Sequence, residues 1–368
     1  MKAIRTGAAV GASSASATMR GMLALPTRVK RKFAGPAIHR DGLELDLDTQ
    51  LLLRLSNAFP RPRLDPVTSP PRMRAAARRM AAIGRGRTIA MPVSDITVAG
   101  AATPLPARVY SPDGADSALV WFHGGGWVVG DLDTHDGLCR RLAARAGRTV
   151  ISVGYRLAPQ HPYPAAVEDA VAAYTDIVSR AAQFGIAPDR VAVGGDSAGG
   201  YLAALACQRL AARDLPIPAA QLLLYPLTDF TATTGSRATL AHGFDLTRTD
   251  LEFFSRCFLP RHIDPGAPDV SPLAVHDPGG LPPALIVTAG FDPLRDEAHA
   301  YARRLRDAGV TVTHHQFDSY THGFANNTLA FGSAVDQIAD LYATLLTTTG
   351  DDATHASSPA AQAGLSHP

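Results

Sequence analysis

Residues 191–200, with the sequence VAVGGDSAGG, constrain the fold of this chain more than any other stretch. An apolar, β-branched run stops at glycines, a serine follows, and an apolar helix-forming run extends over residues 201–210. Residues 195–199 fit the pattern G-x-S-x-G, in which a sharp strand-to-helix turn exposes a serine. Only small residues let the two backbones pass closely there. The pattern is weak alone, but its context predicts that Ser197 is a nucleophile at a helix N-terminus.

The bulk composition is typical of a globular protein. The 368 residues are 46% hydrophobic and 18% charged, which predicts a large core in one or two domains. A net charge of +2 provides no bulk attraction to nucleic acid. The three cysteines are widely spaced and form neither a zinc pattern nor a disulfide framework, which favours a reducing compartment. No apolar run approaches membrane-spanning length, and the N-terminus is too polar for a convincing signal sequence. We therefore expect a cytoplasmic protein rather than a secreted or membrane-associated one.

From residue 89 onward, strand-like segments alternate with helix-like segments. The expected strands are residues 96–98, 107–110, 118–122, 149–155, 190–193, 220–225, 283–289 and 311–317. The expected helices are residues 138–146, 165–180, 197–212, 294–308 and 335–346. This alternation predicts the α/β class, with a mostly parallel central sheet covered by helices on both faces. Active groups in such sheets gather beyond the carboxyl ends of the strands.

The remaining segments suggest a lid over those strand ends. Residues 1–40 carry eight Lys or Arg and no acidic residue, and a flexible segment is favoured over a membrane-surface or partner-binding arm. The arginine-rich residues 72–87 are expected to form a solvated helix face. The predicted organisation is a flexible N-terminal segment (1–40), the first part of a cap (41–87), core (88–225), a cap insertion (226–265), core (266–349) and a disordered tail (350–368).

A serine hydroxyl becomes a good nucleophile when a base removes its proton and a carboxylate orients that base. In folds with this turn, the chain order is serine, acid, histidine. Of the 13 histidines, His322 alone follows a predicted strand at the expected place and in the expected order. Asp292 stands at the carboxyl end of the strand 283–289. An aspartate before a proline is also a good helix cap, so the residues alone leave both roles open for Asp292.

A glycine run, HGGGW at residues 123–127, follows the predicted strand 118–122. Bare backbone N–H groups in such a run can stabilise the oxyanion of a tetrahedral intermediate, together with the N–H of Ala198 after the nucleophile. A flexible turn or a phosphate loop is the alternative, and the Lys-Ser/Thr ending of a phosphate loop is absent. We expect His123 and Trp127 to anchor and pack this loop.

Five motifs in order carry a resemblance to a known family. They are HGGGW at 123–127, YRLAPQHPYPA at 155–165, GDSAGG at 195–200, DPLRDE at 292–297 and HGF at 322–324. Together they resemble the hormone-sensitive-lipase family of esterases, in its Gly-Asp-Ser-Ala-Gly branch, over residues 90–346. The resemblance implies an α/β-hydrolase fold with a helical cap, built from the N-terminal region and an insertion before the acid-bearing strand.

The resemblance also implies roles for individual residues. The nucleophile, acid and base of the family correspond to Ser197, Asp292 and His322. Its oxyanion glycines correspond to Gly124 and Gly125, with Ala198 as the third donor. Members mostly hydrolyse small carboxylic esters with short to medium acyl chains and use no cofactor or metal. Relatives are often dimers, so a homodimer is an expectation for this chain.

The chain departs from the family at Gly154 and Gln160, where Asp and Glu are common. We expect altered local packing or electrostatics at these positions without loss of activity. The function that the sequence favours is a serine carboxylesterase. Hydrolysis of arylamides is the alternative within the fold. A non-catalytic receptor on the same scaffold is the alternative outside it, and the presence of all three triad residues weighs against that alternative.

Overall fold

One eight-stranded sheet forms the centre of the protein in a computed structural model that describes residues 14–58 and 64–356. Its strands are β3 (Val93–Val98), β4 (Leu105–Tyr110), β5 (Ala118–Phe122), β6 (Thr149–Val153), β7 (Val191–Asp196), β8 (Gln221–Leu224), β9 (Ala284–Phe291) and β10 (Val312–Thr321). The strand order is β10-β9-β8-β7-β5-β6-β4-β3. Strands β5 to β10 pair in parallel, whereas β4 pairs antiparallel with β6 and with β3.

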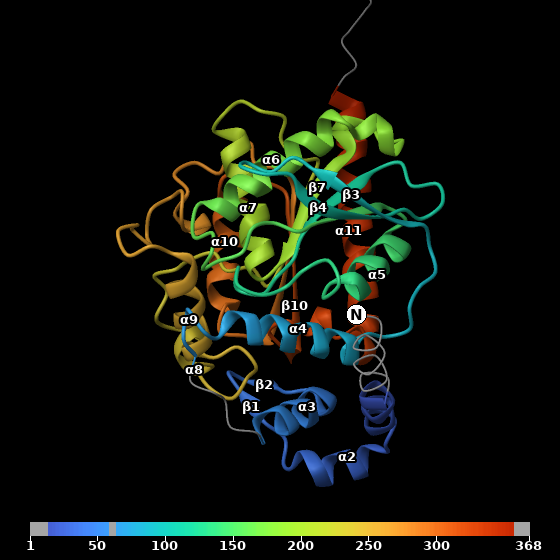
Figure 1. The fold of residues 1–368 in the computed structure, drawn as a ribbon, viewed down its shortest axis with the longest axis vertical. Coiled ribbons are helices and arrows are strands. Elements are labelled where there is room, and N and C mark those ends of the chain that lie inside the picture. The colour runs from blue at the N-terminus through green and yellow to red at the C-terminus, as the bar shows by residue number, and fades with distance from the viewer. Residues whose placement is uncertain (1–13, 59–63, 357–368) are drawn as a thin grey trace, which may run out of the picture.

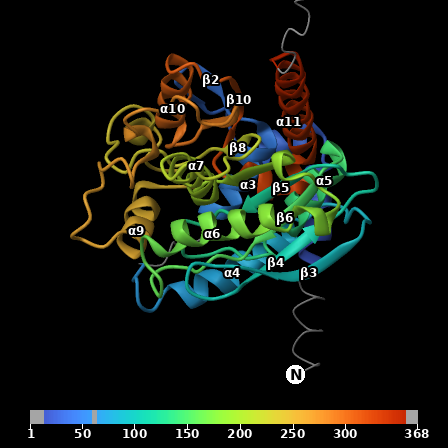
Figure 2. The ribbon, with the colours of Figure 1, turned by 90° about the horizontal axis from the view of Figure 1, so that it is seen from above.

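Helices cover both faces of the sheet, as the sequence predicts (Figure 2). The long helices are α5 (Asp136–Ala146), α6 (Ala165–Ser179), α7 (Ala198–Ala211), α10 (Arg295–Asp307) and α11 (Thr328–Ala356). Helices α6, α7 and α10 contribute to one apolar cluster, and α5 and α11 contribute to the other. Because both faces are covered, every residue of β5, β7 and β9 is buried. This burial explains why these strands are continuous apolar runs in the sequence. The predicted α/β class is therefore confirmed.

The two strands that precede the expected acid and base differ in detail from the prediction. Strand β9 extends to Phe291 and so ends directly before Asp292. Strand β10 extends to Thr321, with a register irregularity between Phe317 and Thr321, and so ends directly before His322. Because parallel strands end at the same edge of a sheet, both residues lie at the edge where Ser197 follows β7.

The N-terminal elements lie below the sheet in Figure 1, on the side where α4 crosses the molecule. Residues 14–23 are helical, and α2 (Thr27–Ala34), β1 (His39–Arg40), β2 (Leu43–Glu44), α3 (Leu47–Asn57) and α4 (Pro70–Gly84) follow. From residue 14, the segment that the sequence predicts to be flexible forms these helices, and the Gln50 and Arg54 side chains of α3 donate to the carbonyl oxygen of Ala34 in α2. The expectations for residues 1–13 and 357–368 fall outside the described residues. Residues 350–356, where a disordered tail is predicted, continue α11.

The insertion after β8 contains α8 (Ser236–Thr239) and α9 (Arg248–Phe258). Helix α9 begins with a capping box in which the Thr247 and Asp250 side chains bond to each other's backbone N–H groups. The buried Phe253 and Phe258 anchor α9 in the larger apolar cluster. The short 3₁₀ turns are η1 (Ala181–Phe184), η2 (Pro188–Arg190), η3 (Pro272–Ala274) and η4 (Phe324–Asn326). None of the helices in the described ranges is long and apolar enough to cross a membrane.

Candidate active site

Ser197 stands at the turn between β7 and α7 with φ of 54° and ψ of −118°. A positive φ is strained for a serine and persists only where the surroundings enforce it. The Ser197 N–H donates to the carbonyl oxygen of Leu224 over 2.8 Å, which fixes the turn against β8. Close approach also requires glycine, since a Cβ on Gly199 would lie 1.8 Å from the carbonyl oxygen of Phe122. The first turn of α7 is therefore packed directly against the end of β5.

The structure brings Ser197, His322 and Asp292 together as one chain of hydrogen bonds. His322 Nε2 lies 2.8 Å from Ser197 Oγ, and His322 Nδ1 lies 2.7 Å from Asp292 Oδ2. With its proton on Nδ1, the imidazole donates to the carboxylate and presents the Nε2 lone pair to the serine hydroxyl. These distances suit a general base and the group that orients it.

Asp292 is not the cap of α10, whose N-cap is Leu294, but its two carboxylate oxygens bond to the turn before that helix and to His322. One carboxylate oxygen, Oδ1, accepts a hydrogen bond from the N–H of Leu294 over 2.8 Å and so fixes the turn before α10. The other oxygen faces His322. Asp292 is fully buried, so its carboxylate is held in one orientation by protein groups.

The glycine loop, residues 123–127, differs from the expectation at Gly124. Its N–H donates to Asp196 Oδ1 over 2.9 Å and is therefore already bound within the protein. Gly125 and Gly126, with φ of 116° and 58°, line the same cavity as Ser197 and Ala198. Among residues 14–58 and 64–356, neither the Gly125 nor the Gly126 N–H has a hydrogen-bond acceptor. Two backbone donors of this loop are thus free beside the serine, and Gly124 is not one of them.

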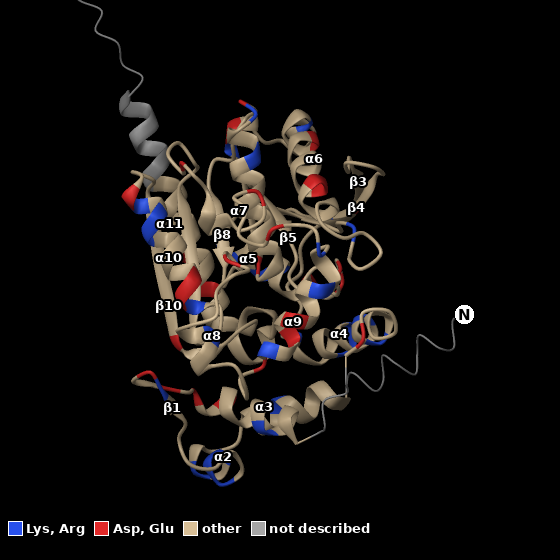
Figure 3. Cartoon of the chain, turned by 90° about the vertical axis from the view of Figure 1, so that its left-hand side faces the viewer, with Lys and Arg blue, Asp and Glu red and all other residues tan. Residues whose placement is uncertain are grey.

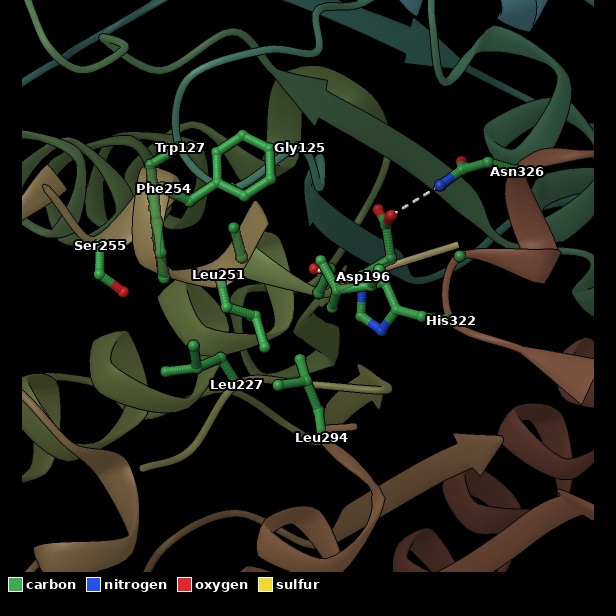
Figure 4. Close-up of a pocket in the computed structure, with 15 residues that line it drawn as sticks. Gly125, Trp127, Asp196, Leu227, Leu251, Phe254, Ser255, Leu294, His322 and Asn326 are labelled. Atoms are coloured by element: carbon green, nitrogen blue, oxygen red, sulfur yellow. Dashed lines mark hydrogen bonds between the residues drawn. The ribbon is translucent and has the colours of Figure 1, made fainter. Parts of the chain in front are cut away.

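Asp196 holds the loops around the serine together, and Figure 4 shows its bond to Asn326. The carboxylate is 1% exposed and accepts hydrogen bonds from the Gly124 N–H (2.9 Å), His135 Nε2 (3.3 Å) and Asn326 Nδ2 (2.7 Å). Burial acts to raise the pKa of Asp196, but these partners outweigh burial and hold the pKa below its ordinary value. The carboxylate is therefore charged. In the pattern G-x-S-x-G, the position of Asp196 can be any residue. Only the presence of a charged residue beside an apolar strand indicates that Asp196 has hydrogen-bond partners in the protein.

His123 anchors the glycine loop from inside the protein. Its ring stacks on Tyr155 with centroids 4.3 Å apart, and Nδ1 lies 2.8 Å from the carbonyl oxygen of Gly124. The hydroxyl of Tyr155 donates to the carbonyl oxygen of His123 over 2.7 Å. Burial lowers the pKa of His123 to about 4, so the ring is neutral at pH 7. Trp127 closes the loop by stacking on Phe258 at 4.2 Å. Both side chains have the anchoring and packing roles that the sequence suggests.

Two cavities adjoin the glycine loop. The first, of about 150 Å³, is the cavity into which Ser197 and His322 open. Figure 4 shows Trp127, Leu227, Leu251, Phe254 and Leu294 in its apolar wall, to which Leu246 also belongs. The second, of about 280 Å³, shares Gly125, Gly323 and Asn326 with the first, and its outer wall consists of Met19, Ala77, Met80 and Ala81. The N-terminal elements thus contribute to the second cavity and the insertion after β8 to the first.

Helix α4 is attached to the core through arginines that the sequence suggests are solvated. Arg74 Nε donates to the carbonyl oxygen of Val128 over 2.8 Å, and Arg78 pairs with Asp131. Arg74 also donates to Gln160 Oε1 over 2.8 Å. The uncharged Gln160, one of the two departures from the family, is therefore an acceptor for α4.

The described residues contain no group of three or more His, Cys, Asp or Glu side chains that could hold a metal ion. The three cysteines, Cys139, Cys207 and Cys257, are free and buried. The polar groups that surround Ser197 include the imidazole of the histidine and the backbone amides of the glycine loop. This arrangement can abstract a proton, attack a carbonyl carbon and stabilise the resulting oxyanion.

Comparisons with known proteins agree with this geometry. A family model described as the alpha/beta hydrolase fold matches residues 119–326. Carboxylic ester hydrolase LipN of Mycobacterium tuberculosis is 47% identical over 82% of this chain and 83% of its own length. Ethyl acetate hydrolase of Pseudomonas putida is 41% identical over 63% of this chain and 74% of its own.

Solved structures point the same way. The ester-hydrolase EH1AB1 from the metagenome of Lake Arreo, complexed with a derivative of bipyridine phosphonate, superposes with a TM-score of 0.79 at 38% identity. The match covers 83% of this chain and 99% of that one. The carboxylesterase EstE1, from a metagenomic library, has a TM-score of 0.72 at 36% identity over 77% of this chain and 99% of its own. The chain belongs to the α/β-hydrolase family, in its hormone-sensitive-lipase-like branch of esterases.

Proposed function

We propose that this protein is a serine carboxylesterase that hydrolyses small esters with short to medium acyl chains through an acyl-enzyme. The observation that carries the proposal is the His322 ring between Ser197 Oγ and Asp292 Oδ2, at 2.8 Å and 2.7 Å. Relatives named as carboxylic ester hydrolase and ethyl acetate hydrolase support the ester as the substrate class.

In the first half of the reaction, Ser197 Oγ attacks the ester carbonyl carbon while His322 Nε2 accepts the hydroxyl proton. Asp292 holds the imidazole in the required tautomer and stabilises its charged form. We assign the oxyanion donors to the N–H groups of Gly125, Gly126 and Ala198, since the Gly124 N–H is bound to Asp196. His322 then donates its proton to the leaving alkoxide, which departs as an alcohol.

In the second half, water attacks the acyl-enzyme with His322 again as the base. The same backbone donors stabilise the second tetrahedral intermediate, and the release of the carboxylic acid regenerates Ser197. No step needs a cofactor, because the nucleophile, the base and the oxyanion donors all come from the chain.

The cavities favour a division of the substrate between them. The first cavity opens directly onto Ser197 and measures about 150 Å³, so we assign it to the acyl group that stays on the serine. An apolar cavity of this size holds benzene, so an acyl group of about six carbons fits. We assign the alcohol to the second cavity, beside the chain that follows His322. Residues 41–87 and 226–265 would then act as the two parts of a cap.

The test is hydrolysis of p-nitrophenyl butyrate by the Ser197→Ala variant. We expect kcat/KM to fall by at least about 10,000-fold, since the remaining groups give only residual catalysis. Ser255→Ala is the matched control, because Ser255 lines the same cavity but is not one of the three triad residues. Retained turnover by Ser197→Ala would overturn the proposal. A matched anilide should react more slowly than the ester, and the opposite order would indicate an amidase.

A further inference from the structure

Helix α2 concentrates cations in a part of the chain that has no acidic residue. Its sequence is TRVKRKFA, and residues 1–40 contain eight Lys or Arg but no Asp or Glu. The two cations in the middle of the helix are bound to α3. Lys30 Nζ lies 2.5 Å from Asp48 Oδ1, and Arg31 donates to Gln50 Oε1 over 3.2 Å. The buried Ala34 lies on the same face, so this face of α2 is attached to the protein.

The opposite face of α2 points away from α3. Because residues four apart lie on the same side of a helix, Arg28 and Lys32 form one row, and Val29 and Phe33 form the neighbouring row. Arg28 and Lys32 are exposed, and the Phe33 side chain is 63% exposed. Within the described ranges, neither Arg28 nor Lys32 has an ion-pair partner. The outer face therefore combines two unpaired cations with an exposed aromatic side chain.

The position of α2 makes this face accessible. Figure 1 shows α2 at the lower end of the long axis, outside α3 and remote from the core helices. Figure 3 shows blue residues and no red ones on α2. Such a helix end can meet a flat surface before any other described element does.

We propose that the outer face of α2 docks the protein on an anionic lipid surface. Arg28 and Lys32 would contact the headgroup charges, and Phe33 would enter the boundary with the acyl chains. A cationic row beside an apolar row is the pattern of helices that lie in a membrane interface. The exposed Phe33 ring favours a lipid surface over nucleic acid. A single short helix with one exposed ring, in a chain whose net charge is only +2, is poorly suited to bind nucleic acid. This docking does not depend on the esterase activity.

The test is flotation of the full-length protein with vesicles of phosphatidylcholine alone or with phosphatidylglycerol added. We expect the protein to float with the anionic vesicles only and to be released by high salt. Each cation near an anionic surface strengthens binding about fivefold, so Arg28→Gln/Lys32→Gln should weaken it roughly 30-fold. Phe33→Ala should weaken it about tenfold, because the ring no longer enters the interface.

The matched control is Arg213→Gln/Ile217→Ala, which removes an exposed cation and an exposed apolar side chain after α7. It should leave binding to the anionic vesicles unchanged. All variants should hydrolyse p-nitrophenyl acetate like the natural chain, since neither cavity is lined by α2. The proposal is overturned if the natural chain does not float with anionic vesicles. It is also overturned if the control weakens binding equally, or if poly-uridylate binds α2 more tightly than the vesicles do.

Discussion

The carboxylate of Asp196 accepts a hydrogen bond from the N–H of Gly124 over 2.9 Å, so the residue before the nucleophile holds the glycine loop. The same carboxylate accepts a bond from Asn326, a few residues after His322. One buried charge therefore connects the segments that carry the serine, the free amides and the histidine. This linkage predicts that the distances within the site depend on Asp196 as well as on the three residues of the hydrogen-bonded chain.

The first prediction concerns Asp196→Asn. The amide would place an NH₂ group where only acceptors are needed, and the glycine loop would shift. A displacement of about 1 Å in a catalytic group can cost roughly 100-fold in rate, so we expect a fall of that order in kcat/KM for p-nitrophenyl butyrate. Asp340→Asn, at an exposed carboxylate on α11, is the control and should keep full activity. Unchanged activity of Asp196→Asn would show that the loop is held without this charge.

The second prediction concerns Gly126→Ala. The added Cβ would lie 2.3 Å from Phe254 Cγ, and φ of 58° is strained for alanine. We expect kcat/KM to fall about tenfold or more, because a shift of the loop displaces its amides. Phe254→Ala in the same chain should restore part of the activity by removing the clash. Gly147→Ala has a similar φ, 64°, with nothing within 4 Å of its Cβ, and should lose about 1 kcal/mol of stability but no activity. Failure of the double variant to recover would exclude the clash as the cause.

The third prediction concerns the acyl specificity. Leu251→Ala enlarges the cavity that opens onto Ser197, so the preferred acyl chain of p-nitrophenyl esters should lengthen. Met80→Ala enlarges the second cavity and should change kcat/KM across a series of acetate esters of different alcohols instead. Because the alcohol has left before deacylation, Met80→Ala should not change the deacylation rate of a common acyl-enzyme. The reverse pattern would exchange the assignments of the two cavities.

The fourth prediction concerns the pH dependence of stability. Burial lowers the pKa of His123 from 6.5 to about 4, so the unfolded chain takes up this proton at a higher pH than the folded chain does. The contribution of the neutral His123 ring to the free energy of unfolding is complete above pH 6.5. It is lost as the pH falls towards 4, and the total loss is about 3 kcal/mol. Urea denaturation across this window should give a shallower pH slope for His123→Phe than for the natural chain. Equal slopes would show that the pKa of His123 is the same in the folded and the unfolded chain.

Much of this architecture follows from sequence patterns because buried parallel strands are continuous apolar runs. The strand before Asp292 is such a run, and the glycines of the elbow are visible as a motif. The strand before His322, VTHHQFDSYT, is largely half-buried and polar, so the sequence shows its end less clearly. The sequence does not show which amides of the glycine loop are free, because a run of glycines does not reveal that the Gly124 N–H is bound to Asp196. Arg74 was equally unpredictable, since its acceptor is a backbone carbonyl at Val128, far along the chain. The homodimer and the cytoplasmic location stay predictions.

The proposed mechanism requires a covalent intermediate at Ser197 that His322 and Asp292 make possible. The most direct measurement is mass spectrometry of the protein after reaction with the organophosphate paraoxon, together with its activity on p-nitrophenyl butyrate. We predict one diethylphosphoryl group per chain, on the peptide that contains Ser197, and loss of hydrolysis in proportion to the modification. Full activity of the modified protein, or modification at a residue other than Ser197, would show that Ser197 is not the nucleophile.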